Sequence, residues 1–255
     1  MIEAPEHHAR RGSALDAMVT VVVLLALWQG VYGYVGDAAI APPLTAVRHL
    51  AAMLATASFW DHIMATLTAF AGALALAAVL GTLLGLVFGI RRFAGDVAEP
   101  VLAGLYSVPK VTLYPMILLM FGLGMGAKVA FGLIHGVIPI TLFTLSAVKA
   151  INPVLLRTAR ALRLSQFETI RTVLAPAVLP EMVTGLRVGF SLTLLGVLIG
   201  EMFASQKGLG FLIVNGLSLH NVKQTTAVIL MVVLLAIAAN GSLLWLDRRL
   251  VHRGE

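Results

Sequence analysis

Long apolar segments, interrupted by short clusters of charged and turn-forming residues, dominate this chain. Six of these segments contain few or no charged side chains. Because a helix needs about 20 apolar residues to cross the hydrocarbon core of a bilayer, each segment is long enough to span a membrane. The pattern predicts six spanning helices, at residues 17–36, 63–90 (between His62 and Arg91), 100–127, 129–148, 183–203 and 224–246.

The composition of the chain supports a membrane protein. Of the 255 residues, 59% are hydrophobic and only 12% are charged, about half the charged share of a soluble domain. The mean hydropathy is +0.96. These values exclude an ordinary soluble enzyme, a disordered chain and a collagen-like chain, and an outer-membrane barrel would show short alternating segments instead of long apolar runs. The predicted fold class is therefore all-α, a polytopic membrane protein with about six transmembrane helices.

Several kinds of site chemistry are absent from the sequence. The chain has no cysteine, which excludes disulfides and thiolate metal sites, and its seven histidines are scattered without metal-ligand spacing. No G-x-x-x-x-G-K-[ST] loop is present, so we do not expect the chain to bind ATP in a P-loop. The sequence predicts no catalytic residue, no metal and no cofactor bound by this chain, and hence no enzyme.

The formal net charge of +6 follows from topology. With the N-terminus in the cytoplasm, thirteen lysines and arginines fall on the cytoplasmic side, four fall outside, and Lys110 lies in a span. This asymmetry obeys the positive-inside rule and predicts that both termini are cytoplasmic, without a nucleic-acid partner. The chain then divides into a tail (1–14), one transmembrane domain (15–250) with a cytoplasmic loop at 149–187, and a second tail (251–255).

The first apolar segment admits one other interpretation, a secretory signal peptide. A basic start, an apolar run and Ala39-Ile40-Ala41 have the order of such a peptide. The run is longer than the usual range of about 7–15 residues, and Pro42 directly follows the potential cleavage site. We therefore interpret the segment as an uncleaved first span.

The basic loop, residues 149–187, carries six positive and two negative side chains and has helical patterns of its own. Asn152 is suited to cap a helix that begins at Pro153, and Ser165 with Glu168 forms a capping box that starts a second helix. The apolar face expected on the first helix consists of Leu155, Leu156, Ala159 and Leu162. The face expected on the second consists of Phe167, Ile170 and Leu174, and Pro176 and Pro180 are expected to end that helix. Physical reasoning leaves three alternatives open, namely a lipid-surface segment, a docking element for a cytoplasmic partner, and a solvated loop.

Three residues within or near the predicted spans are candidates to line a translocation path. Lys110 lies inside the third span, flanked by Pro109 and Pro115, which predict a kinked or interrupted helix. It either presents a positive charge to the path or snorkels to an interface. Tyr114 lines the path or packs against other helices, and Glu201 either faces the path or is an interfacial carboxylate paired with a residue such as Lys207.

Two further features are interpreted as packing, and a role in gating is the alternative for the first of them. Glycines recur at a spacing of four residues, which places them on one face of a helix: Gly81, Gly85 and Gly89; Gly185 and Gly189; Gly196 and Gly200. Small residues on one face let helix backbones approach closely in lipid. His135, in the fourth span, is expected to be a hydrogen-bonded packing residue.

The basic loop resembles the EAA loop of ATP-binding cassette (ABC) importer permeases. The resemblance rests on residues 157–165 (RTARALRLS) and 167–180 (FETIRTVLAPAVLP), whose Leu-Pro ending matches the family motif. Outside the loop, APPLTAV (41–47), VPKVTLYP (108–115), FGLG (121–124), GEM (200–202) and GLG (208–210) are similar to the nitrate/sulfonate/taurine-type permeases. The matches cover residues 15–250 in order.

This resemblance implies a type I ABC importer permease fold in a bacterial inner membrane. It implies two separate ATPase subunits that hold ATP and Mg, a second permease copy forming a homodimer, and an external substrate-binding protein. The solute would be a small anion such as a sulfonate, taurine or nitrate. The resemblance, carried over by position, implies that the ATPase-coupling residues are Arg157, Thr158, Ala159, Arg163, Ser165, Leu179 and Pro180. We add Leu162 from the helix pattern and Glu168 from the capping pattern.

The loop departs from the family motif at three positions. Arg157 replaces the family glutamate, Thr158 the first alanine, and Arg163 the glycine. Since glycine permits a sharp turn, arginine at position 163 predicts a less strained turn or a continued helix.

Two rival functions remain. An ion-coupled secondary transporter or channel would be favoured by carboxylates buried within the spans, and Glu201 is the one candidate in the sequence. A membrane scaffold that recruits a cytoplasmic partner without transport is the other.

Overall fold

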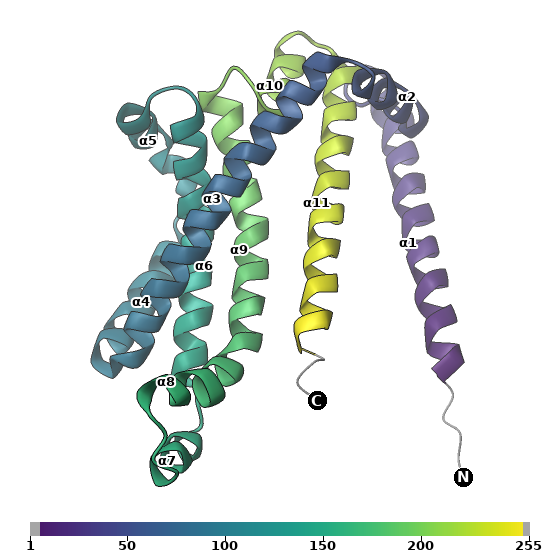
Figure 1. Cartoon of the computed structure of the whole chain (residues 1–255). Helices are drawn as coiled ribbons and strands as arrows, with labels where there is room; N and C mark the ends of the chain where they lie inside the picture. The colour runs from purple at the N-terminus through teal and green to yellow at the C-terminus, as the bar shows by residue number, and fades with distance from the viewer. Residues whose placement is uncertain (1–5, 252–255) are drawn as a thin grey trace. The chain divides into compact units, whose positions relative to one another are not determined.

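The structure is a computed structural model that describes the backbone of residues 6–251 and the side chains of residues 15–242, except 156, 160, 166, 167, 170 and 204. The side chains of Leu156, Phe167 and Ile170, and those of both predicted tails, therefore lie outside the described residues. Every regular element in the described part is helical (Figure 1). The elements are α1 (Glu6–Val35), α2 (Pro43–Leu54), α3 (Ala57–Ile90), α4 (Arg92–Ser107), a 3₁₀ turn (Lys110–Leu113), α5 (Tyr114–Phe121), α6 (Met125–Lys149), α7 (Pro153–Ala161), α8 (Gln166–Thr169), a π-helical turn (Ile170–Leu174), α9 (Ala175–Ala204), α10 (Leu209–Ser218) and α11 (Val222–Val251).

The predicted all-α membrane fold is confirmed. Five helical segments in the described part are long and apolar enough to cross a bilayer, and they match five of the six predicted spans: Leu15–Val35, Ala57–Ile90, Met125–Lys149, Arg171–Phe203 and Val222–Ser242. The sixth is a pair, Arg92–Ser107 with Lys110–Phe121, bent by 86°.

The break in the third span follows from its prolines. Proline has no backbone N–H and disfavours helical geometry at the residue before it, and Val108 is accordingly extended (φ −67°, ψ 132°). Pro115 stands in the first turn of α5, where a missing N–H costs nothing. The predicted interruption is confirmed, but the predicted bounds are wrong, because α4 already begins at Arg92 and residues 125–127 belong to α6.

The chain divides into two units, one formed by Met1–Ala57 with Ile213–Met231, the other by Ser58–Leu212 with Val232–Glu255. In the first unit, the indole N–H of Trp28 donates to the carbonyl of Ala41 over 3.0 Å, and the Ala41 N–H donates to Thr226 Oγ1 over 3.2 Å. These bonds tie α1 and the start of α11 to the segment that precedes α2, a helix that hydropathy did not predict.

The second unit is built on the close packing of α6 against α9 and α3 (Figure 1). A Cβ added to Gly85 of α3 would lie 2.5 Å from Cβ of Thr144, and one added to Gly81 would lie 2.8 Å from Cβ of Ile140. Such distances leave no room for a side chain. The glycine pattern therefore packs α3 on α6 within one chain, as the packing interpretation predicted.

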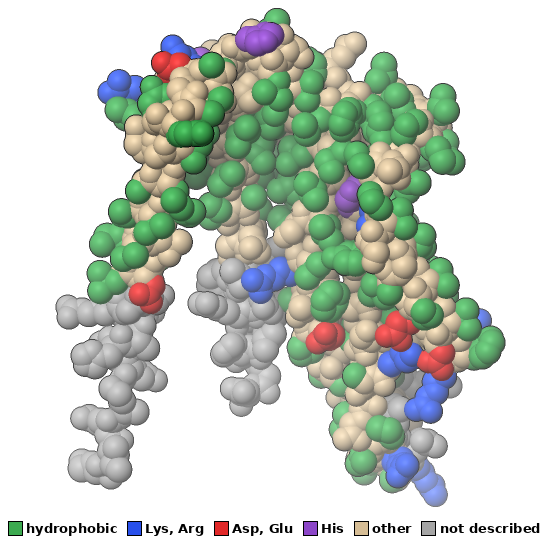
Figure 2. All heavy atoms as spheres, turned by 180° about the vertical axis from the view of Figure 1, so that it is seen from behind, with side chains coloured by type: hydrophobic (Ala, Val, Ile, Leu, Met, Phe, Trp, Pro, Cys, Tyr) green, Lys and Arg blue, Asp and Glu red, His purple; other side chains and the backbone are tan. Residues whose placement is uncertain are grey.

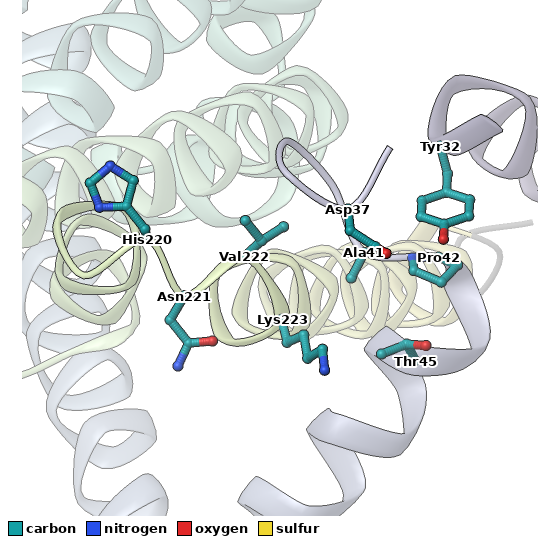
Figure 3. A pocket seen from close by; sticks show the side chains of 9 residues that line it. All are labelled: Tyr32, Asp37, Ala41, Pro42, Thr45, His220, Asn221, Val222 and Lys223. Atoms are coloured by element: carbon teal, nitrogen blue, oxygen red, sulfur yellow. The ribbon is translucent and has the colours of Figure 1, made fainter. Parts of the chain in front are cut away.

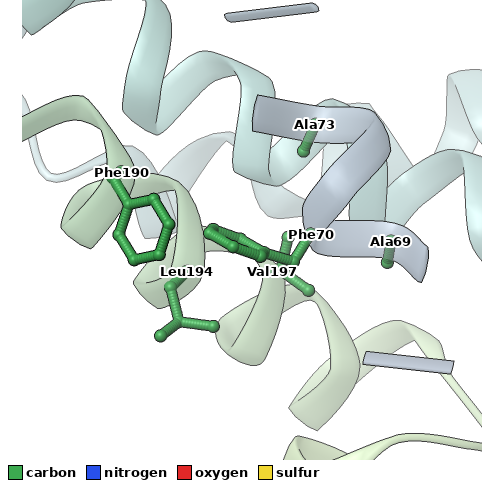
Figure 4. Close-up of a cluster of buried hydrophobic side chains, with 6 residues drawn as sticks. All are labelled: Ala69, Phe70, Ala73, Phe190, Leu194 and Val197. Carbon is green, nitrogen blue, oxygen red and sulfur yellow. The ribbon is translucent and has the colours of Figure 1, made fainter. Parts of the chain in front are cut away.

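An aromatic pair closes the seam between α3 and α9 in the second unit. Phe70 and Phe190 meet edge to face with ring centroids 4.7 Å apart, a favoured aromatic geometry. Ala69 and Ala73 from α3 and Leu194 and Val197 from α9 complete this buried cluster (Figure 4).

Gly85→Ala should destabilise this bundle, because the new methyl group overlaps the backbone and side chains of α6. Overpacking of this kind costs roughly 1–3 kcal/mol, which would appear as a lower Tm of the detergent-solubilised chain. Gly104→Ala on α4 is the matched control, since nothing lies within 4 Å of the added Cβ. Equal losses in the two variants would contradict the packing role.

Candidate functional site

The first helix of the basic loop begins as its sequence predicts. The Asn152 carboxamide oxygen accepts a hydrogen bond from the Val154 N–H over 2.9 Å, and Pro153 is the first residue of α7. A helix of 9 residues is too short to be stable in water by itself. Its caps and its contact with the chain therefore hold it.

The end of α7 is a left-handed turn at Arg163. The Leu164 N–H donates to the Ala159 carbonyl over 3.0 Å and the Leu162 N–H donates to the Thr158 carbonyl over 2.9 Å, a Schellman-type ending. Arg163 occupies the position that glycine normally takes in this motif and has φ 53°. The expectation of a less strained turn or a continued helix is thus wrong: arginine adopts the glycine conformation because the flanking hydrogen bonds impose it.

The predicted capping box at Ser165 and Glu168 is confirmed. The Ser165 N–H and hydroxyl donate to the Glu168 carboxylate over 2.8 and 2.7 Å, and the Glu168 N–H donates back to Ser165 Oγ over 3.2 Å. These bonds, the backbone one first, hold the pKa of the Glu168 carboxyl below its usual range. The turn into α8 therefore keeps its cap throughout neutral and mildly acidic pH.

The prediction that Pro176 and Pro180 end the second helix is wrong. Helix α8 passes through a π-helical turn at Ile170–Leu174 directly into α9, which contains both prolines. Pro176 stands just after the π-helical turn and Pro180 stands inside α9, so the helix continues through both prolines although each of them lacks an N–H. The basic loop is consequently continuous with a membrane-spanning helix.

The loop presents apolar side chains to its surroundings. Leu155 and Leu162, two helical turns apart, are 42% and 67% exposed, and Leu179 is 43% exposed. Ala159 alone of the predicted coupling residues is buried against the chain, at 2% exposure. The remaining ones are exposed, namely Arg157, Thr158, Arg163, Ser165, Glu168 and Pro180. Figure 2 shows Lys and Arg side chains gathered at the end of the second unit that carries α7 and α8.

A surface salt bridge joins α6 to α4 where the basic loop begins. Lys149 Nζ lies 2.5 Å from the Asp96 carboxylate and 2.9 Å from that of Glu99. Sequence reasoning counted Lys149 only as a loop charge, because its partners lie about 50 residues away along the chain.

Glu201 is fully buried in an ion pair with Lys128. Glu201 is 0% exposed and Lys128 3%, and Lys128 Nζ lies 3.3 Å from Glu201 Oε1. Thr66 Oγ1 lies 2.8 and 3.0 Å from the two carboxylate oxygens, and the Gly210 N–H donates over 3.0 Å. The suggested pairing with the Lys207 side chain is wrong, since it is the Lys207 carbonyl that takes part, accepting from Lys128 Nζ.

The three candidate path residues fall into separate environments. Lys110 is partly exposed, donates to the Tyr106 carbonyl over 3.0 Å and lies 5.1 Å from the centre of the Tyr106 ring. Tyr114 packs against Phe131 and Phe203, and its buried hydroxyl has no hydrogen-bond partner in the described part of the chain. Among the described residues, neither side chain forms a hydrogen bond with Glu201, Lys128 or Thr66.

His135 is a packing residue, as predicted. Its Nδ1 lies 2.8 Å from the Phe131 carbonyl and the side chain is 8% exposed. Within the described residues no group of three His, Asp or Glu side chains is arranged to hold a metal ion.

The first unit contains a polar pocket of about 460 Å³ between residues 32–45 and 220–223 (Figure 3). Asp37 and Lys223 bring opposite charges to its wall, and Tyr32, Thr45 and Asn221 add further polar groups. Residues 37–45 and 220–223 fall in loops predicted on the side opposite the basic loop, and Tyr32 lies near the end of the first predicted span. Sequence reasoning did not identify this pocket, because its two halves are more than 170 residues apart.

Comparison with known proteins shows a match to one family. The family model described as binding-protein-dependent transport system inner membrane component matches residues 77–252. The riboflavin transport system permease protein RibX of Chloroflexus aurantiacus is 32% identical over 203 residues, covering 78% of this chain and 75% of RibX. The taurine transport system permease protein TauC of Escherichia coli is 27% identical, covering 76% of this chain and 73% of TauC.

A solved structure shares the fold. An inward-facing structure of the MetNI methionine ABC transporter matches with a TM-score of 0.59 at 16% identity, covering 76% of this chain and 96% of the MetNI chain. Further relatives include sulfonate and nitrate permeases. The predicted resemblance and fold are thereby confirmed.

Arg163→Gly should stabilise the end of α7, because a left-handed conformation costs a non-glycine residue roughly 1–2 kcal/mol. We expect stronger hydrogen-exchange protection of the α7 amides. Arg163→Ala is the control, since it removes the charge but keeps the strain. An equal gain of protection in Arg163→Ala would show that repulsion among the arginines, and not the backbone, destabilises the turn.

Proposed function

This chain belongs to the family of binding-protein-dependent transport system inner membrane components, and from that premise we propose that its basic loop docks on a separate ATPase. The chain is a multi-pass, inner-membrane permease subunit of an ABC importer for a small solute. In the proposed assembly, two identical permease copies with cytoplasmic termini bind two ATPases inside and a substrate-binding protein outside. ATP and Mg belong to the ATPases.

The single observation that carries the docking proposal is the exposed apolar face of α7. Leu155 in α7 and Leu162 directly after it are exposed, although both ends of α7 are capped. A short, preorganised helix with apolar anchors suits a hydrophobic groove on a partner, and preorganisation reduces the entropy lost on docking. Arg157 and Arg163, also exposed, supply charges at the edge of that contact.

Leu162→Asp should abolish co-purification of the ATPase, because a carboxylate would be buried in the apolar groove. The measurement is ATP hydrolysis by the complex purified through a tag on this chain. Leu219→Asp is the matched control, since Leu219 is equally exposed, at 67%, but lies in a loop predicted on the opposite side. Retention of the ATPase by Leu162→Asp would contradict docking and leave α7 as a lipid-surface helix.

For the solute, we propose a small anion or zwitterion of the taurine, sulfonate or nitrate type. The similarity to TauC and to sulfonate and nitrate permeases supports this class. The partly exposed ammonium of Lys110, at the break between α4 and α5, is the positive group proposed to meet it, with Tyr114 and its unpaired hydroxyl beside it in the sequence.

Lys110→Met should lower uptake of radiolabelled taurine or nitrate at limiting concentration by about tenfold or more, because a hydrogen bond to a charged group contributes roughly 1.5–3 kcal/mol. Lys110→Arg, which keeps the charge, should retain most uptake, and both variants should still co-purify with the ATPase. Uptake by Lys110→Met equal to that of the unchanged chain would exclude Lys110 from the path.

A further inference from the structure

Side chains of three helices bond to the backbone of the segment Lys207–Gly210, where α9 gives way to α10. The Gly208 N–H donates to His62 Nδ1 over 3.0 Å, and the Leu209 N–H donates to Thr66 Oγ1 over 2.9 Å. The Lys207 carbonyl accepts from Lys128, and the Gly210 N–H donates to Glu201. Each of four consecutive residues thus has its backbone bonded to α3, α6 or α9, all within the second unit.

The glycines of this turn are shaped around the Glu201 carboxylate. Gly208 has φ 125°, a conformation that side chains rarely adopt, and a Cβ there would overlap the carboxylate of Glu201. A Cβ on Gly210 would collide with the Leu198 carbonyl. Only glycine lets the turn approach a carboxylate this closely, so the GLG segment (208–210) and Glu201 depend on each other for their packing.

A buried ion pair is a costly way to fix a turn. Desolvation of two charges offsets much of their attraction, so apolar packing would serve stability equally well. Breaking such a pair is strongly unfavourable, because it leaves an uncompensated charge in a medium of low polarity. The pair therefore favours the closed arrangement of the turn strongly over one in which the two charges are separated but still buried.

Helix α9 connects this cluster to the basic loop. The helix spans Ala175–Ala204, about 45 Å at 1.5 Å per residue, with the loop continuous at one end and Glu201 one turn from the other. A slide or rotation of α9 against α3 and α6 by more than about 1 Å would stretch the Glu201 contacts to Thr66 and Lys128 beyond hydrogen-bonding distance.

We propose that Glu201 is a positioning residue whose ion pair with Lys128 latches the Lys207–Gly210 turn to α3 and α6, closed in this structure and released when α9 moves. Glu201 therefore does not line the translocation path in this conformation; it controls the turn at the end of α9 remote from the basic loop. The closed latch is independent of the proposed function, whereas its release during ATP turnover rests on that function.

Absence of cysteine makes the test direct, since one introduced thiol reports alone. Leu209 and Leu145 are both 0% exposed, the first in the latched turn and the second in the core of α6. In the purified full chain, Leu209→Cys should react slowly with a maleimide, and adding Glu201→Gln should accelerate the reaction at least tenfold. Leu145→Cys should stay protected in the same background.

Two outcomes of that experiment would overturn the latch. One is an unchanged reactivity of Leu209→Cys when Glu201→Gln is added. The other is exposure of Leu145→Cys as well, which would indicate general unfolding. Lys128→Met should accelerate labelling of Leu209→Cys as well, because it leaves the buried Glu201 carboxylate without its ammonium and the Lys207 carbonyl without its donor.

Release is tested in the assembled importer. Labelling of Leu209→Cys should rise at least fivefold when the ATPases are trapped with ATP and vanadate, with Leu145→Cys again unchanged. If nucleotide has no effect in an assembly that hydrolyses ATP, the moving latch is wrong and the cluster is static. If no ATPase partner is found, the proposed function is refuted. The closed latch would still stand, because its test uses the isolated chain.

Discussion

The close approach of α3, α6 and α9 is the constraint on which the rest of the second unit depends. Glycines on α3 and α9 bring backbones to distances that leave no space for another methyl group. This contact excludes water, and only in such a dry seam does a 0%-exposed carboxylate need a buried ammonium beside it. Helix α9, which this packing involves, runs from the basic loop to the Glu201 cluster, so one helix connects the two candidate sites.

Charge is used differently at the two ends of α9. In the basic loop, the side chains of Arg157, Arg163 and Arg171 are exposed. The surface bridge from Lys149 to Asp96 and Glu99 contributes little energy because water screens it. Around Glu201 the charges are few, buried and fully paired. An interface that must form and separate suits the first arrangement, and an all-or-none structural switch suits the second.

Much of the fold and part of the site could be predicted from local patterns. The spans, the capping box at Ser165 and Glu168, and the break beside Pro109 depend on neighbours within a few residues, and these predictions are confirmed. The conformation of Arg163 and the passage of α9 through its prolines were predicted wrongly. In both cases hydrogen bonds and helix continuity outweighed the local preference of one residue type.

The sequence by itself determined that this chain spans a membrane and belongs among importer permeases, because hydropathy and short motifs are properties of contiguous residues. Only the tertiary structure decided that Glu201 pairs with Lys128, 73 residues away, and not with nearby Lys207. It also decided that Leu155 and Leu162 are exposed and which glycines meet α6. The physical reason is that a pairing across helices depends on how their faces pack, and one sequence does not encode that locally.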